Sequence, residues 1–272
     1  MVAEQQTKEV LKSIVQQSRG NFLSLAAAQH IAAKFDCSLG CIERTALDNQ
    51  IVPARFKRNS LSCPEQLRLL QSRVSIIGCG GLGGRIAELL ARLGIGHLVL
   101  TDPDIFSESN LNRQIFCTTQ TLGLNKIEVL ARELGSINPT LEFTLNINKF
   151  NKESIATANI VVDGLDSPAA RKCLSALCQK QNIPLVHGAV KEWYGQAGVE
   201  KVPGNLIDTL YPDNLQSSQT PPLVLPMTVA LIAAIQAAET CKYLLNLDSP
   251  LTKKFLQTDL LQQEYETIPF DC

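Results

Sequence analysis

Apolar and polar positions follow a repeating order from Arg73 onward. An apolar run, a glycine-rich turn, a helical pattern and a second apolar run succeed one another as VSIIG, CGGLGG, RIAELLARLGIG and HLVLTD. Further helical periods lie at 126–134 and 169–181, and further apolar runs at 142–147, 160–163 and 185–186. Strands separated by helices are typical of βαβ units with a parallel sheet buried on both faces. We therefore expect a doubly wound, Rossmann-like α/β sheet.

The first 50 residues have a different pattern and predict a small N-terminal helical module, followed by a second domain over 51–272. Two helical periods flank Asp36-Cys37-Ser38, with apolar positions at Ala28, Ile31, Ala32 and Phe35 and then at Leu39, Ile42 and Ala46. Ser38 is the expected N-cap of the second helix. The pair resembles a helix-turn-helix, but acidic residues outnumber basic ones between Gly20 and Gln50. Because a DNA-binding surface must neutralise phosphates, we favour a packing module over a nucleic-acid reader.

Two segments near the C-terminus complete the expected organisation. Prolines over 201–226 predict an irregular crossing loop or lid. An apolar helix over 227–245 is expected to cover the sheet, and it carries Gln236, Glu239 and Lys242. These polar residues distinguish it from a membrane span.

Composition narrows the class of protein. The chain has 272 residues, 45% hydrophobic and 19% charged, with 25 basic against 26 acidic side chains. This balance excludes a disordered chain and gives no global basic excess for nucleic acid or a membrane surface. The nine cysteines are odd in number and follow no short framework, and the first residues lack the apolar core of a signal peptide. We expect a cytoplasmic protein.

A glycine-rich turn is the strongest sign of a ligand site. Gly78, Gly80, Gly81 and Gly83 follow an apolar strand and open a helix, so that the backbone can approach a phosphate at a helix N-terminus. Nineteen residues beyond Gly83, Asp102 ends the second strand and is placed to accept hydrogen bonds from ribose hydroxyls. These features predict a nucleotide site.

The residues after this site do not fit a nicotinamide enzyme well. Asp102 and Asp104 lead into Ser109-Asn110-Leu111-Asn112-Arg113-Gln114, and Lys126 begins the next helical period. Fixed cations beside a nucleotide stabilise the charge that spreads over phosphate oxygens during phosphoryl chemistry. Each cation alone could instead be a solvated surface charge.

Taken together, these motifs resemble the ThiF/MoeB/HesA family, relatives of the ubiquitin-activating enzymes. The resemblance covers roughly 52–262 and includes GCGGLGG, the two aspartates, SNLNRQ, Lys126, VVDGLDS and PLVHGAVKEWYGQAG. It implies adenylation, with ATP and magnesium, of the C-terminal carboxylate of a small ubiquitin-fold sulfur carrier protein ending in Gly-Gly. Pyrophosphate would be released.

The resemblance also implies roles for individual residues. Gly78, Gly80, Gly81 and Gly83 would face phosphate, and Asp102 and Asp104 would bind ribose. Asn110, Arg113, Gln114 and Lys126 would contact the triphosphate, and Asp166 would be the magnesium-linked aspartate. Alternatively, Asp163 or Asp166 caps the helix beginning near Ala169. ARFKRN resembles a segment whose arginine reaches the neighbouring subunit, which implies a homodimer and points to Arg58, although this stretch could equally be a solvated basic turn.

Three departures from the family pattern limit the chemistry expected after adenylation. No cysteine lies between Cys178 and Cys241, so a thioester or persulfide on the crossing loop is not expected. The chain lacks paired C-x-x-C motifs and ends in a lone Cys272, so zinc is not expected. Cys79 and Cys117 are expected to be small apolar residues, and His187, where the family commonly has a small residue, to be a satisfied core histidine.

Three other functions remain open on the sequence alone. The same fold could adenylate a peptide C-terminus or a modified tRNA base. A nicotinamide-dependent oxidoreductase would leave Arg113, Gln114 and Lys126 without a role. A non-catalytic regulator would pair an N-terminal helical reader with a nucleotide sensor, and would show salt-dependent DNA binding.

Overall fold

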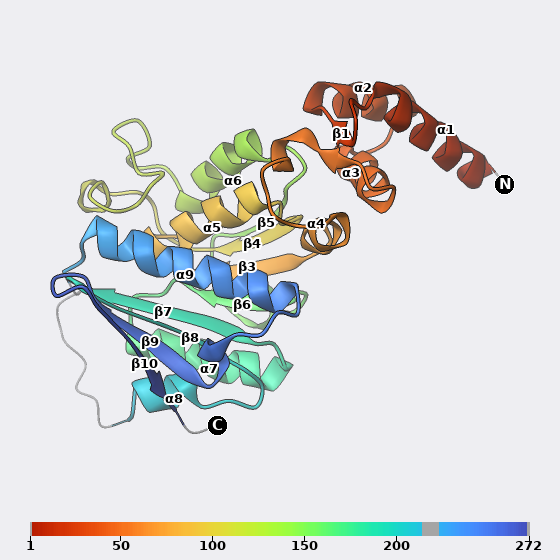
Figure 1. Cartoon of the computed structure of the whole chain (residues 1–272). Helices are drawn as coiled ribbons and strands as arrows, with labels where there is room; N and C mark the ends of the chain where they lie inside the picture. Colours follow the sequence, from red (N-terminus) through yellow and green to blue (C-terminus); the bar gives the residue numbers. More distant parts are fainter. Residues whose placement is uncertain (1, 214–222, 271–272) are drawn as a thin grey trace.

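One mixed eight-stranded sheet forms the centre of the protein. The computed structural model describes residues 2–213 and 223–270. The strand order is β10-β9-β8-β7-β6-β3-β4-β5 (Figure 1). The strands are β3 (Arg73–Ile77), β4 (His97–Thr101), β5 (Glu142–Asn146), β6 (Ile160–Asp163), β7 (Leu185–Lys191), β8 (Tyr194–Glu200), β9 (Lys254–Asp259) and β10 (Glu264–Pro269).

The sheet has a parallel part and an antiparallel part. Strands β5, β4, β3, β6 and β7 are parallel neighbours, whereas β8, β9 and β10 continue the sheet in antiparallel pairings. The parallel part confirms the predicted doubly wound fold. The antiparallel part is a feature that the apolar pattern did not predict.

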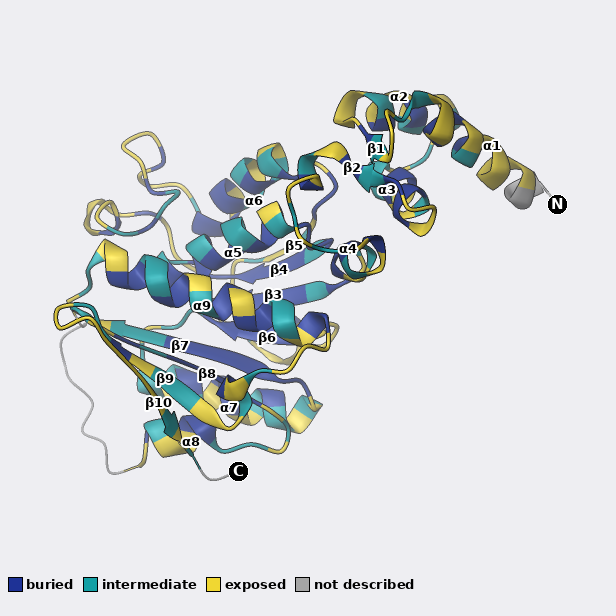
Figure 2. Ribbon diagram, viewed as in Figure 1, coloured by how far each residue is buried: buried dark blue, intermediate teal, exposed yellow. Residues whose placement is uncertain are grey.

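Helices cover both faces of the sheet. Successive side chains of β3 point to opposite faces and are buried on both, so each face needs an apolar cover. The buried cluster on one face includes Val74 and Ile76 with residues from α5 (Gly81–Leu93), α6 (Lys126–Ile137) and α9 (Pro226–Leu244). The cluster on the other face includes Ile77 with residues from α7 (Pro168–Gln181) and α8 (Leu206–Leu210). Figure 2 shows the buried sides of these helices turned toward the strands. Both faces of β3 and β6 are therefore apolar, which explains the continuous hydrophobic runs of these central strands.

The N-terminal residues form a separate small layer (Figure 1). It contains α1 (Val2–Gln17), β1 (Phe22–Leu23), α2 (Leu25–Phe35), α3 (Leu39–Asp48) and β2 (Val52–Pro53), with its own apolar cluster. The Ser38 side chain caps α3 as predicted. Only two helical periods were expected here, and α1 is a third helix.

A partly buried ion pair joins this layer to the sheet domain. Arg55 donates to Glu43 of α3, whose side chain is 1% exposed, through Nη1 and, at 2.6 Å, through Nη2. The same Nη2 lies 2.9 Å from Asn138 Oδ1 and 2.8 Å from Thr140 Oγ1, beyond the end of α6. Arg55 is therefore a structural link, not a solvated basic turn.

The proline-rich segment was only partly predicted. Helix α8 lies inside the segment 201–226, which we interpreted as irregular, and was not expected. Outside this segment, the short helix α4 (Cys63–Leu70) was also not expected. The first turn of α8 can form because Leu206 and Ile207 are buried and the Ile207 N–H donates to Glu200 Oε1 at 3.0 Å. Pro221 and Pro222 lie outside the described residues. Within the described ranges, no helix has the length and apolar character needed to cross a membrane.

Candidate active site

The glycine turn between β3 and α5 leads into a helix end without a side-chain cap in the described part of the chain. Gly78 has φ +84°, a left-handed conformation that favours glycine. Gly80 is the N-cap of α5, and no side chain of the described residues caps this helix end. The first N–H groups of α5 therefore remain available to an anion, and the helix dipole adds favourable charge.

Asp102 supports the turn from the end of β4. Its Oδ2 accepts the backbone N–H of Cys79 at 2.7 Å, and its Oδ1 accepts that of Asp104 at 2.9 Å. Asp102 is 5% exposed. Each carboxylate oxygen keeps a second lone pair, so the side chain can fix the turn and still accept a hydrogen bond from a hydroxyl group.

Lys126 lies in the same cluster of charges. It is the first residue of α6, and its Nζ donates to Asp104 Oδ2 at 2.9 Å and lies 4.0 Å from Asp102 Oδ2. Only 7% of its side chain is exposed, whereas 65% of the Asp104 side chain is exposed. The fold thus brings Asp102, Asp104 and Lys126 together beside the glycine turn.

Arg113 and Gln114 lie directly against the start of α5. A Cβ added to Gly81 would be 3.5 Å from Arg113 Cγ, and one added to Gly80 would be 3.3 Å from Gln114 Nε2. Gln114 is 6% exposed, and its buried Oε1 has no hydrogen-bond partner among the described residues. An unsatisfied buried amide beside an uncapped helix end is consistent with a polar ligand completing the site.

Asn110 has a structural task in the same loop. Its Oδ1 accepts the Ser107 N–H at 3.0 Å, and it is 8% exposed. Arg113 Nη1 donates to Ser109 O and to Asn112 Oδ1, both at 2.9 Å. The loop therefore holds its own arginine in place.

A second turn, between β6 and α7, touches the glycine turn through bare backbone. A Cβ on Gly78 would lie 2.7 Å from the Gly164 carbonyl oxygen, and one on Gly164 would lie 2.2 Å from that of Gly78. This contact brings the Leu165-Asp166 segment close to the glycine turn. Asp166 is exposed, and its side chain makes no hydrogen bond or ion pair in the described part of the chain.

Neither aspartate of this turn caps α7. Ser167 is the N-cap, and its Oγ accepts the Ala170 N–H at 3.3 Å. The alternative that Asp163 or Asp166 serves as the cap is therefore wrong. The Asp163 Oδ1 instead accepts the Leu165 N–H at 2.9 Å.

His187 is the core histidine that we expected, in a polar cluster that the sequence did not reveal. It is fully buried, and its Nδ1 lies 2.7 Å from Asp163 Oδ2. Arg171 and Tyr211 belong to the same cluster. The pKa of His187 is lowered, because the effect of burial is larger than the opposite effect of the hydrogen bond to Asp163. The only advance sign was a histidine inside an otherwise apolar strand pattern.

The remaining predicted residues lie apart from this cluster. Arg58 is exposed, and no hydrogen bond or ion pair of its side chain occurs within 2–213 and 223–270. Cys79 and Cys117 are buried, and burial raises the pKa of both thiols, that of Cys79 well above its usual range. Cys272 lies outside the described residues.

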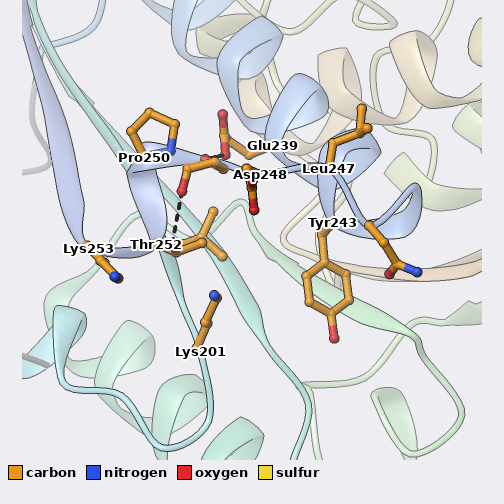
Figure 3. Close-up of a pocket in the computed structure, with 11 residues that line it drawn as sticks. Lys201, Glu239, Tyr243, Leu247, Asp248, Pro250, Thr252 and Lys253 are labelled. Atoms are coloured by element: carbon orange, nitrogen blue, oxygen red, sulfur yellow. Dashed lines mark hydrogen bonds between the residues drawn. The ribbon is translucent and has the colours of Figure 1, made fainter.

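A hollow at the C-terminal end of α9 is separate from the predicted site. Its volume is about 580 Å³, and Lys201, Tyr243 and Lys253 lie on its walls (Figure 3). None of the predicted site residues lines it.

Comparison with known proteins gives a family match over most of the chain. The model of the ThiF family matches residues 47–271. The SAMP-activating enzyme E1 of Haloferax volcanii is 33% identical over 219 residues, which are 76% of this chain and 81% of that protein. The sulfur carrier protein ThiS adenylyltransferase of Escherichia coli is 34% identical over 194 residues, which are 68% of this chain and 77% of that protein.

Solved structures show the same fold. The crystal structure of E. coli MccB superposes with a TM-score of 0.70 at 23% identity, covering 79% of this chain and 69% of that one. The crystal structure of E. coli MccB with ATP superposes with a TM-score of 0.67 at 22% identity, covering 85% of this chain and 78% of that one.

Proposed function

This chain belongs to the ThiF family, and we propose that it uses ATP to adenylate the C-terminal carboxylate of a small ubiquitin-like sulfur carrier protein. The observation that carries the proposal is the placement of Arg113 and Gln114 against the uncapped start of α5, with Lys126 beside the Asp102 carboxylate that supports the glycine turn. The named activities of the relatives give the carrier as substrate. A nicotinamide-dependent oxidoreductase is not supported by this family.

The residues of the turn fit ATP. The free N–H groups of α5 and the Arg113 guanidinium suit the phosphates, and the second lone pairs of Asp102 suit the ribose. Lys126 is buried enough for its charge to act through a low dielectric. We assign the phosphate-facing role to Gly78, Gly80, Gly81 and Gly83, and ribose contact to Asp102 with Asp104.

The reaction needs positioning and charge stabilisation more than a protein nucleophile. The carrier carboxylate oxygen attacks the α-phosphorus of ATP, the bond to the pyrophosphate oxygen breaks, and an acyl-adenylate and pyrophosphate result. Arg113 and Lys126 stabilise the charge that develops on the phosphate oxygens. The buried thiols of Cys79 and Cys117 take no part in this step.

Asp166 is the residue that would hold magnesium. Its exposed carboxylate, on a turn in backbone contact with the glycine turn, is a suitable hard ligand for a cation that keeps several waters. Bound magnesium would supply charge neutralisation to the phosphates. Asn110, whose Oδ1 accepts the Ser107 N–H, would contribute to the triphosphate site mainly by fixing the loop whose Ser109 carbonyl holds Arg113.

We further propose a homodimer in which Arg58 reaches the neighbouring active site. Its exposed side chain contrasts with the half-buried Arg55 three residues earlier, which is paired with Glu43. The N-terminal module, 1–50, would then be a separate unit anchored to the adenylation domain, 51–272, through Arg55. We also propose that the carrier ends in Gly-Gly, as the family resemblance implies, and that the protein is cytoplasmic.

The decisive experiment is ATP–pyrophosphate exchange with candidate carrier proteins from the same genome. We expect magnesium-dependent exchange with one carrier ending in Gly-Gly, and none after its last glycine is removed. Exchange with a short peptide or a tRNA, but with no carrier protein, would show that the proposed substrate is wrong. Tight NAD(H) binding without ATP binding would contradict adenylation itself.

A further inference from the structure

A buried hydrogen-bond relay lies beneath the Gly164-Leu165-Asp166 turn. It contains Asp163 and His187, which are fully buried, and Arg171 and Tyr211, which are each 7% exposed. These residues come from β6, β7, α7 and the segment after α8, so four separate elements meet here. The proposed adenylation chemistry does not use any of them directly.

Donor and acceptor chemistry fixes the direction of the relay. The Tyr211 hydroxyl lies 2.9 Å from Arg171 Nη1 and 2.8 Å from Gln196 Nε2, which are both donors, so its own hydrogen is free to point at His187 Nε2, 3.3 Å away. The neutral imidazole then carries its proton on Nδ1 and donates to Asp163 Oδ2 at 2.7 Å. The hydroxyl and the Gln196 amide, whose Nε2 also lies 3.3 Å from His187 Nε2, therefore set the histidine tautomer, and the histidine orients the aspartate.

The relay ends on the backbone of Leu165. Asp163 Oδ1 accepts the Leu165 N–H at 2.9 Å, and Arg171 Nη2 donates to the Leu165 carbonyl at 2.6 Å. Arg171 Nε also lies 3.4 Å from Asp163 Oδ2, which balances the buried carboxylate charge. Both polar groups of the residue before Asp166 are thus held, while the Asp166 carboxylate is left exposed.

We propose that His187 and Tyr211 are positioning residues that hold the Asp166 carboxylate at the nucleotide site through Asp163 and the Leu165 backbone. The inference rests on the proposed function for its consequence, because it concerns how the magnesium-linked aspartate is aimed. The structural part of the inference is independent of that function, since it predicts that the Leu165 amide is protected from hydrogen exchange in the protein without ligands. Without the imidazole, the Asp163 carboxylate keeps Arg171 but loses the donor that fixes its rotation.

Hydrogen exchange of the ligand-free protein tests the structural part. His187→Leu removes the donor, whereas His187→Asn keeps an N–H near the position of Nδ1. We expect exchange of the Leu165 amide to rise at least ~10-fold in His187→Leu and to stay within ~3-fold in His187→Asn. His30→Leu, at an exposed position on α2, is the matched control.

Two results would overturn the structural part. One is an unchanged Leu165 amide in folded His187→Leu. The other is an equal acceleration of amides throughout β3 and β4, which would mark general destabilisation. If His187→Leu does not fold, Tyr211→Phe removes only the hydroxyl, and the same local acceleration is expected to a smaller degree.

Pyrophosphate exchange then tests the functional part. We expect the magnesium concentration for half-maximal exchange to rise ~10-fold in His187→Leu and to recover in His187→Asn, as for losses of outer-shell support to a metal ligand. The KM for the carrier should not change. A lower rate with an unchanged magnesium requirement would overturn the positioning role. If the wild-type protein shows no exchange with any carrier, the proposed function fails and the amide result alone decides the relay.

Discussion

The side chain of Arg113 lies across the first turn of α5, with its Cδ 3.7 Å from the point that a Cβ on Gly81 would occupy. The arginine stem therefore packs against the start of the helix, and the loop carbonyl of Ser109 holds the guanidinium at 2.9 Å. A cation placed in advance at an uncapped helix end requires little rearrangement when charge develops on a phosphate.

Arg113→Ala should lower ATP–pyrophosphate exchange by ~10²–10³-fold, the scale for loss of one preorganised electrostatic contact. Arg132→Ala is the matched control, because that arginine is 61% exposed on α6 and pairs with the adjacent Glu133. Initial rates at saturating ATP measure the effect. Exchange within a few-fold of wild type would remove Arg113 from the mechanism.

Gly164→Ala should destabilise the protein by about 1–3 kcal/mol, because its Cβ would lie 2.2 Å from the Gly78 carbonyl oxygen and force the two turns apart. ATP affinity should fall with it. Gly135→Ala is the control, since a Cβ there meets nothing within 4 Å in α6 and should stabilise by about 0.5 kcal/mol. Urea unfolding and ATP titration measure both, and equal stability of the two variants would contradict the tight contact.

Arg55→Ala should cost about 3–5 kcal/mol, because it leaves the buried Glu43 carboxylate without its cation. Arg55→Lys should restore little of this, because a lysine cannot reproduce the forked contacts to Glu43, Asn138 and Thr140. The free energy of unfolding in urea is the measurement. A change below about 1 kcal/mol would show that the link is not buried in solution.

Arg58→Ala should change the unfolding free energy by less than about 0.5 kcal/mol but abolish most exchange. A subunit-mixing experiment tests its proposed action across the dimer. Arg58→Ala and Asp166→Ala proteins, each inactive alone, should regain exchange when mixed, because one site of each mixed dimer has both residues. No recovery, in mixtures shown to contain the mixed dimer, would place both residues in the same subunit's site.

The free energy of unfolding should decrease at acid pH because His187 is buried in its neutral form. Burial lowers the pKa of this imidazole, so below about pH 6.5 the unfolded chain binds a proton that the folded protein does not. Stability should then fall with decreasing pH, by up to ~1.4 kcal/mol per unit, until the folded pKa is reached. Unfolding at pH values of about 7.5, 6.5 and 5.5 should show a smaller slope for His187→Asn than for wild type and for His30→Asn. Equal slopes for all three would contradict a neutral buried imidazole.

The parallel half of the sheet was predictable because burial on both faces imposes continuous apolar runs. The expected strand over 160–163 coincides with β6 (Ile160–Asp163), and the expected helix over 169–181 differs from α7 by one residue. Strand β10 was missed because most of its residues are exposed at the sheet edge, so no alternation marks it. Strand β8 has two glycines, which weaken any strand pattern.

The glycine turn and Asp102 were predictable because local backbone requirements demand particular residues at short spacing. The relay beneath the second turn was not predictable. Arg171 occupies a helical stretch where an arginine ordinarily faces solvent, and Tyr211 lies in a proline-rich segment with no period. Only the folded chain brings them to His187, from 16 and 24 residues away along the sequence.

The backbone contact between Gly78 and Gly164 also constrains which substitutions this sequence could accept during evolution. Neither residue can gain even a methyl group unless the opposite loop retreats, so the two positions should be inherited as a unit. Attempts to re-engineer the enzyme that place a side chain at either glycine would have to redesign the opposite loop in the same step, because the added Cβ would clash with its backbone.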